Sequence, residues 1–258
     1  MDAHWRELMF ENYVFSLGRI ARLGVAAHSE RVGPWLCIDA GLGESSFNIA
    51  VLVGETQGTA AAALKRAQRW FDGRGVNSRF DLRSWADAEL IAAAARSGYH
   101  HWWTEPALLL DSIPERFGYP AGFETRLLRT PSDAAAYSRL DSEEHDDHAF
   151  QASMAKTAIG MPGCQLLLGI SEGVPVARSM ANTTGEMVGI HNVYVPPSLR
   201  KRGFGAAVTA GAIMAGREAG ARAACLEATE IGLPVYLRMG FRRVGDYIVL
   251  GKSEPPAW

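Results

Sequence analysis

Residues 193–207, with the sequence VYVPPSLRKRGFGAA, constrain the fold of this chain more than any other segment. A β-branched run ends at Pro196, a turn with Gly203 and Gly205 follows, and an alanine-containing stretch then begins a helix. Free backbone N–H groups at a helix N-terminus attract anions, and glycines let the backbone approach a pyrophosphate closely. The segment therefore predicts a strand, a phosphate-binding turn and a helix, in that order.

Two other phosphate-binding loops can be compared with this turn. A dinucleotide-binding fingerprint needs a third glycine where Val208 stands, and a Walker loop needs a Gly-Lys-Ser/Thr ending that the segment lacks. A nucleotide-binding Rossmann domain is therefore disfavoured. The structural alternative is that Gly203 and Gly205 only form a tight turn.

Hydrophobic periodicity and the positions of helix and strand breakers predict a mixed α/β chain. Helices are expected at 5–20, 59–71, 86–96, 131–139, 148–157, 205–218 and 233–239. Strands are expected at 47–53, 78–82, 101–110 with an interruption at Pro106, 123–128, 165–170, 174–181, 187–195, 223–228 and 247–250.

The chain length allows two lobes, since single cores tend to split beyond roughly 250 residues. Residues 111–122 contain two prolines and two glycines and are interpreted as a linker. This predicts an N-terminal lobe over 1–120 and a C-terminal lobe over 121–258.

Charge and cysteine usage exclude several classes of protein. The formal net charge is −2, and the longest run of basic residues is 200–202, so nucleic acid is not an expected partner. Three widely spaced cysteines provide neither a disulfide framework nor a zinc motif. No apolar stretch reaches the roughly 20 residues of a membrane span, and the polar N-terminus does not resemble a signal peptide. A cytoplasmic protein without membrane association is expected.

Residues 200–205 resemble the acetyl-CoA signature of the GNAT superfamily of N-acetyltransferases, Arg/Gln-x-x-Gly-x-Gly/Ala after a Val-x-Val-Pro strand. Arg200, Gly203 and Gly205 fill its fixed positions. Residues 226–241 resemble the later signature of the same family, a strand followed by Tyr-x-x-x-Gly-Phe. Two motifs in the right order and at the right separation make a stronger resemblance than either alone.

The resemblance covers residues 123–250 and implies the GNAT acyltransferase fold, an α/β fold with a mixed, mostly antiparallel sheet flanked by helices. The strand and helix order of the first lobe resembles the second half of the same fold, but its turn at 54–59 lacks the paired glycines. The first lobe is therefore expected to be a second, degenerate GNAT-like α/β lobe that binds no CoA.

The resemblance also implies acetyl-CoA as the acyl donor substrate and assigns roles to individual residues. The pantetheine arm and the thioester carbonyl are expected at the backbone of Val193, Tyr194 and Val195. The pyrophosphate is expected at Arg200, Lys201, Arg202, Gly203, Phe204, Gly205 and Ala206. Thr229 stands where many members have an asparagine that contacts the cofactor. Tyr236 is expected to donate a proton or a hydrogen bond to the departing thiolate, the alternative being a tyrosine that only packs the last helix on the sheet.

The motifs do not identify the base that deprotonates the acceptor. His191 is one candidate catalytic residue, because an unperturbed histidine has a pKa of about 6.5; its alternative role is a packed strand residue. Glu186 and the acidic residues of 143–147 are further candidates, although that cluster can equally be a solvated loop. The spacing of His145, Asp146 and His148 matches no metal-ligand pattern, and no metal site is expected.

The sequence thus predicts an acetyl-CoA-dependent N-acetyltransferase that acts on a primary amine of a small molecule or protein. The alternative from another class is a non-catalytic acyl-CoA-binding sensor or interaction module. The acceptor stays open, because acceptor pockets depend on variable loops. The oligomeric state also stays open, and a homodimer is one option.

Overall fold

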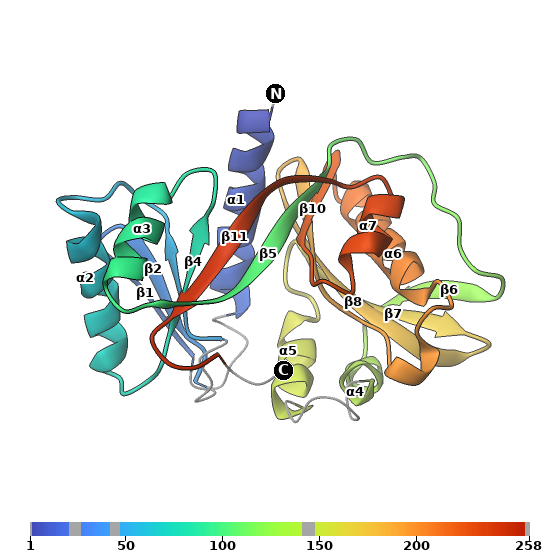
Figure 1. Cartoon of the computed structure of the whole chain (residues 1–258). Helices are drawn as coiled ribbons and strands as arrows, with labels where there is room; N and C mark the ends of the chain where they lie inside the picture. Colours follow the sequence, from blue (N-terminus) through green and yellow to red (C-terminus); the bar gives the residue numbers. More distant parts are fainter. Residues whose placement is uncertain (1, 21–26, 42–46, 141–147, 256–258) are drawn as a thin grey trace. The chain divides into compact units, whose positions relative to one another are not determined.

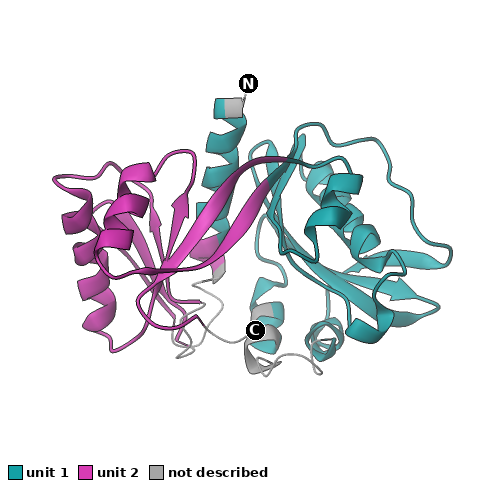
Figure 2. Ribbon diagram, in the orientation of Figure 1, with its two compact units in different colours: residues 1–16, 108–242 teal, residues 17–107, 243–258 magenta. Residues whose placement is uncertain are grey.

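The computed structural model describes residues 2–20, 27–41, 47–140 and 148–255 (Figure 1). Its contacts divide the chain into two compact units (Figure 2). Unit 1 consists of residues 1–16 and 108–242, and unit 2 of residues 17–107 and 243–258. These units differ from the single boundary expected at 120/121, because unit 1 also takes the first helix and unit 2 also takes the last strand.

Unit 2 is a sheet with the strand order β1-β2-β3-β4-β11-β5 and two helices. Its strands are β1 His28–Val32, β2 Trp35–Asp39, β3 Ile49–Leu52, β4 Arg79–Arg83, β5 His100–Leu110 and β11 Arg242–Gly251, and its helices are α2 Ala60–Asp72 and α3 Ala88–Arg96. The buried residues of both helices share one apolar cluster with Trp35, Phe80 and Leu250. This cluster is the core of the unit.

Unit 1 has the strand order β5-β10-β9-β8-β7-β6, with the last residues of β5 at one edge. Its further strands are β6 Phe123–Leu127, β7 Cys164–Ser171, β8 Val174–Thr184, β9 Met187–Tyr194 and β10 Ala223–Glu227. Its helices are α1 Asp2–Ile20, which ends in unit 2, α4 Pro131–Arg139, α5 His148–Ala158, α6 Phe204–Glu218 and α7 Leu233–Arg238. The strands β6, β7, β8 and β9 pair antiparallel in that order, and β9 pairs parallel with β10.

The two units repeat one arrangement. In unit 2, β3 is followed by α2 and then by β4, which pairs parallel with β3. In unit 1, β9 is followed by α6 and then by β10, which pairs parallel with β9. Each repeat continues with a helix and a final strand. The strand after α3, β5, runs into unit 1, whereas the strand after α7, β11, pairs with β4 of unit 2. The expected mixed, mostly antiparallel α/β fold is confirmed.

Sequence reasoning missed one element of unit 2 and was wrong about another. The hairpin of β1 and β2 was not expected, because β1 is a largely exposed strand whose only large apolar residue is Val32. The strand β5 is also not interrupted at Pro106, which lies inside it. A proline is tolerated in a strand where its nitrogen is not needed for the ladder.

The segment 111–122, expected to link two lobes, lies inside unit 1. Ile113 and Phe117 pack against the apolar cluster that contains α6, and the carbonyl of Glu115 accepts a hydrogen bond from Arg217 Nη1 at 2.9 Å. The breakers in this segment therefore keep it out of helix and strand without making it a boundary.

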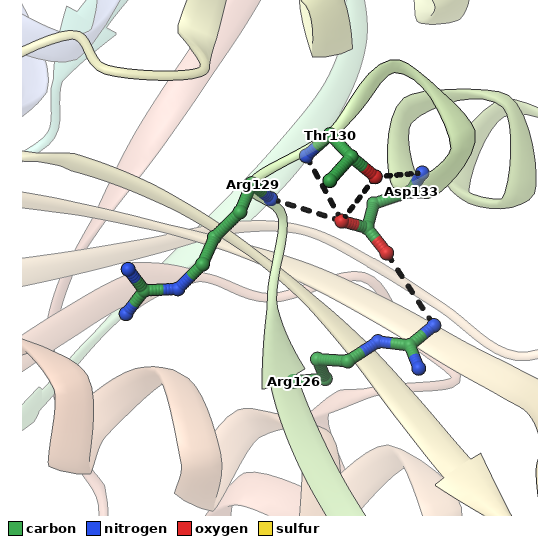
Figure 3. A network of polar contacts seen from close by, with 4 residues as sticks. All are labelled: Arg126, Arg129, Thr130 and Asp133. Carbon is green, nitrogen blue, oxygen red and sulfur yellow. Dashed lines mark hydrogen bonds and ion pairs between the residues drawn. The ribbon is translucent and has the colours of Figure 1, made fainter.

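A capping box connects β6 to α4 (Figure 3). Thr130 Oγ1 accepts from the backbone N–H of Asp133, and Asp133 Oδ2 accepts from the backbone N–H groups of Arg129 and Thr130. Arg126 Nη2 lies 3.4 Å from the other carboxylate oxygen. The hydrogen bond from the Arg129 N–H is the largest of the effects that lower the pKa of Asp133. The start of α4 is thereby fixed to the strand before it.

Helix α1 is fastened to the unit 1 sheet by Asn12, which is fully buried. Asn12 Nδ2 donates to the carbonyl of Asn182 at 2.8 Å and to Thr184 Oγ1 at 2.9 Å. Its Oδ1 lies directly over Gly189 of β9, where a Cβ atom would overlap it. The helix can sit this close only because position 189 is a glycine.

Gly189→Ala is therefore expected to destabilise the protein by about 1–3 kcal/mol, the usual cost of overpacking a core. The added methyl group would also lie 2.8 Å from His191 Nε2. Denaturant unfolding measures the change. Gly118→Ala is the control, because Gly118 is exposed and a Cβ there has no neighbour within 4 Å. Equal stability of the two variants would show that α1 does not pack on Gly189.

Candidate active site

The strand β9 carries a bulge near its C-terminal end. On the side of β8, Arg178 pairs with Tyr194 and Met180 with His191, so β9 has one more residue than β8 between these pairs. Asn192 takes up the extra residue with a positive φ of 51°. A bulge of this kind bends its strand and increases the local twist.

On the side of β10, the pairing of β9 also stops before its C-terminal end. The parallel pairing with β10 runs from Met187 with Ala223 to Gly189 with Cys225, and no later pair joins these two described strands. Residues 190–194 of β9 therefore extend past the part of the strand that pairs with β10.

A buried polar cluster supports the bulge. Arg178, only 2% exposed, donates to Asn192 Oδ1 at 3.2 Å and to the carbonyl of Tyr137 at 3.3 Å. Its guanidinium carbon lies 5.2 Å from the ring centres of both Tyr137 and Tyr194. Asn192 Nδ2 in turn donates to the Tyr137 hydroxyl at 3.0 Å. These contacts hold the bulge in one conformation.

The loop after β9 turns the backbone N–H groups outward. A short 3₁₀ turn, η2 Pro197–Leu199, is followed by Lys201 with φ 63° and Gly203 with φ 82°. The side chain of Arg200 folds back, so that its Nε donates to the carbonyl of Val195 at 3.0 Å. Arg200 therefore closes the loop, while Gly203 at the N-cap of α6 has the conformation that favours glycine.

Six consecutive amides of this loop and helix start have no acceptor within the described protein. The first backbone bond into α6 is from the N–H of Ala207 to the carbonyl of Gly203, at 3.0 Å. The amides of residues 201–206 precede it, and residues 201–203 are exposed. The N-terminus of a 15-residue helix adds a positive dipole end at the same place. Free amides at a helix N-terminus are an arrangement that suits a phosphate group.

Tyr236 lies on the face of the unit 1 sheet that α6 covers. It is 9% exposed and shares an apolar cluster with Ala212 and Ile213 of α6 and Leu226 of β10. Burial raises the pKa of Tyr236 to about 12, an effect that the nearby Thr209 hydroxyl opposes. The phenol is therefore protonated at neutral pH and able to donate.

His191 lies on the opposite face of the sheet, next to Gly189 and the end of the Asn12 side chain. Its Nδ1 is 3.7 Å from Glu227 Oε2 of β10, and both side chains are mostly buried. Its Nε2 is buried without a hydrogen-bond partner. The imidazole thus has one nitrogen directed at a carboxylate and a second, buried nitrogen that makes no hydrogen bond in the described protein.

Burial lowers the pKa of His191 to about 4. An unfolded histidine titrates near 6.5, so between these values only the unfolded state is protonated. The contribution of the neutral histidine to stability is present above pH 6.5 and is lost as the pH falls towards 4, up to roughly 3 kcal/mol.

The melting temperature of the wild-type protein is accordingly expected to fall more between pH 7 and pH 4 than that of His191→Gln. His100→Gln, at an exposed histidine, is the control and should follow the wild type. Parallel pH dependence of all three proteins would contradict a neutral, buried His191.

The other predicted site residues do not all gather at this place. Glu186 is exposed in the turn before β9, at the other end of the strand, and pairs with Arg222 at 3.0 Å. Thr229 Oγ1 accepts from the N–H of Gly232 at 3.2 Å and so closes the turn that precedes α7. The acidic cluster of residues 143–147 and the side chain of His148 lie outside the described residues.

Sequence reasoning missed Glu227 and Thr209. Glu227 lies two residues after Cys225 and therefore on the same face of β10. Cys225 pairs with Gly189, so this is also the face of His191. Thr209 carries no local signal, since a threonine inside a helix is ordinary. Within the described residues, no group of three or more His, Cys, Asp or Glu side chains could hold a metal ion. The described helices also include none with the length and apolarity needed to cross a membrane.

The parted strands β9 and β10, with a row of free amides at the start of α6, define an acyl-CoA-dependent acyltransferase domain. Residues 125–241, a little less than half of the chain, match the model of the acetyltransferase (GNAT) family, and this segment is a GNAT acetyltransferase domain. No curated protein sequence matches the chain significantly.

Solved structures share the fold over nearly the whole chain. A GCN5-related N-acetyltransferase from Kribbella flavida is 19% identical with a TM-score of 0.71, covering 94% of this chain and 93% of its own. A GCN5-related N-acetyltransferase from Sphaerobacter thermophilus is 16% identical with a TM-score of 0.64, covering 87% and 82%. A tandem GNAT protein from the clavulanic acid biosynthesis pathway is 14% identical with a TM-score of 0.63, covering 91% and 86%. These likenesses in fold include unit 2, which repeats the strand–helix–strand arrangement of unit 1.

Proposed function

We propose that the protein is an N-acetyltransferase that transfers the acetyl group of acetyl-CoA to a primary amine of a small molecule or protein. The observation that carries this proposal is the position of the six free amides, directly after the stretch of β9 that has left β10. A pyrophosphate bound there directs the pantetheine arm along the part of β9 beyond its pairing with β10. Tyr236 and His191 lie on the two faces beside that segment.

Donor binding follows from the backbone. The amides of 201–206 hold the pyrophosphate, and Gly205 leaves room for it, since a Cβ there would touch only Val195 at 3.7 Å. The backbone of β9 beyond its pairing with β10, from Val193 to Val195, pairs with the pantetheine amides, as an added strand would. One N–H of this segment then points at the thioester oxygen and stabilises the oxyanion.

The acceptor approaches from the face of His191. Its amine nitrogen attacks the thioester carbon and gives a proton to Nε2 of His191, and the carboxylate of Glu227 stabilises the imidazolium that forms. The carbon–sulfur bond then breaks, and the Tyr236 hydroxyl donates its proton to the sulfur. The buried histidine is a weak base, so its contribution rests on its position and on Glu227 more than on its intrinsic pKa.

The test is an acetyl-CoA-dependent thiol-release assay with a panel of polyamines, amino acids, aminoglycosides and peptides. Release with at least one amine, lost in His191→Gln with acetyl-CoA affinity retained, is the expected result. Tight acetyl-CoA binding with no release for any amine would overturn the proposal and favour a non-catalytic acyl-CoA sensor.

A further inference from the structure

Thr209 on α6 has a hydroxyl that the fold leaves unused. Its side chain is fully buried, and Oγ1 has no hydrogen-bond partner in the described protein. Threonine in a helix commonly donates to the carbonyl one turn earlier, but Thr209 does not. A buried hydroxyl without a partner costs about 1–3 kcal/mol, so stability alone would favour valine, which has the same shape.

Thr209 lies on α6 between the phosphate-binding loop and the residues of the helix that pack with Tyr236. Thr209 follows Gly205 by four residues, which puts both on one face of α6, a single turn apart. Ala212 and Ile213, in the next turn, pack in the same cluster as the Tyr236 ring. The Thr209 hydroxyl is close enough to Tyr236 to lower the pKa of the phenol, although no hydrogen bond of ordinary geometry joins them.

Resting on the proposed function, we propose that Thr209 is a positioning residue for acetyl transfer, whose hydroxyl hydrogen-bonds to Tyr236 Oη when the donor is bound. As the Tyr236 proton passes to the departing sulfur, negative charge develops on Oη. The Thr209 O–H donates to that oxygen and stabilises the charge. After CoA leaves, Tyr236 takes a proton back from water. Threonine at position 209 therefore makes the folded protein less stable than valine would, but it makes Tyr236 a better proton donor.

The kinetic test compares Thr209→Val, Thr209→Ser, Tyr236→Phe and the double variant Thr209→Val/Tyr236→Phe. Thr209→Val should fold with an equal or higher melting temperature, keep KM for acetyl-CoA within about two-fold, and lower kcat about 10-fold or more, the worth of one hydrogen bond to a charged group. Thr209→Ser restores the hydroxyl and should recover most of kcat. In the Tyr236→Phe background, Thr209→Val should cause no further loss.

Wild-type kcat in Thr209→Val, or an equal loss in both backgrounds, would overturn the positioning role. A second readout does not depend on turnover: with 3-fluorotyrosine at position 236, ¹⁹F NMR reports the titration of this one phenol in the presence of CoA. Thr209→Val should raise its pKa, and an unchanged pKa contradicts the inference even if no amine acceptor is found. Absence of transfer in the wild type, with the pKa change present, would refute the proposed function but not the contact.

Discussion

Gly203→Glu is expected to abolish the thermal stabilisation that acetyl-CoA gives to the wild-type protein. A ligand at 100 times its Kd that binds only the native state raises the melting temperature of a chain of this size by roughly 5–10 °C. A carboxylate at the N-cap of α6 would occupy the place of the pyrophosphate and repel it. The free amides of 201–206 would then face a negative side chain instead of a ligand.

Gly203→Gln is the matched control. Both variants place a side chain of the same size at φ 82°, so both carry the same backbone strain and differ in charge alone. Glutamine should keep part of the ligand-induced shift in differential scanning fluorimetry. A full shift in Gly203→Glu would mean that the loop is only a tight turn and that acetyl-CoA binds elsewhere.

Tyr236→Phe is expected to lower kcat about 10-fold to 1,000-fold while the affinity for acetyl-CoA changes little. Proton donation commonly contributes about 100-fold to 10,000-fold, but a thiolate with a pKa near 8.5 leaves with less help than an alkoxide. The ring itself should keep its packing, including the edge contact with Phe241 at 6.0 Å between centroids. The loss therefore belongs to the hydroxyl.

Tyr247→Phe serves as the control for removal of a buried tyrosine hydroxyl, because Tyr247 is fully buried in unit 2. It should leave kcat unchanged. Both variants are measured with the acceptor found in the thiol-release assay, at several pH values. Wild-type turnover of Tyr236→Phe across that range, with His191→Ala inactive, would assign the proton donor elsewhere.

The parts of the site that sequence predicted are those that depend on local chain geometry. The turn at 200–205 needs glycine at a positive φ and free amides at a helix start. Both features depend on residues that are adjacent in the sequence, so a local pattern can indicate them. Glu227 and His191 are 36 positions apart and meet only through the register of β10 on β9. Asn12 is farther still from Gly189. Contacts of this kind depend on strand pairing, which a single sequence does not specify.

The domain boundary was missed for a related reason. Prolines and glycines at 111–122 have the composition of a linker, and composition cannot tell whether Ile113 and Phe117 are anchored to a core. The exposed β1 likewise lacks the alternation of a half-buried strand. In both places the local pattern is irregular or polar, and tertiary contacts decide the structure.

The positions of β5 and β11 in the sheet also affect the order in which the chain can fold as it is synthesised. Translation delivers β4 some 160 residues before β11, its partner in the sheet, so the edge of β4 that β11 covers stays open while nearly all of unit 1 is synthesised. An open strand edge is a template for pairing with other chains. Unit 2 cannot be completed before β11 has been synthesised, after nearly all of unit 1. A gene cut after residue 120 would yield an N-terminal fragment that lacks β11, the partner of β4, and a C-terminal fragment that lacks β5, and the strand edges left unpaired would favour aggregation.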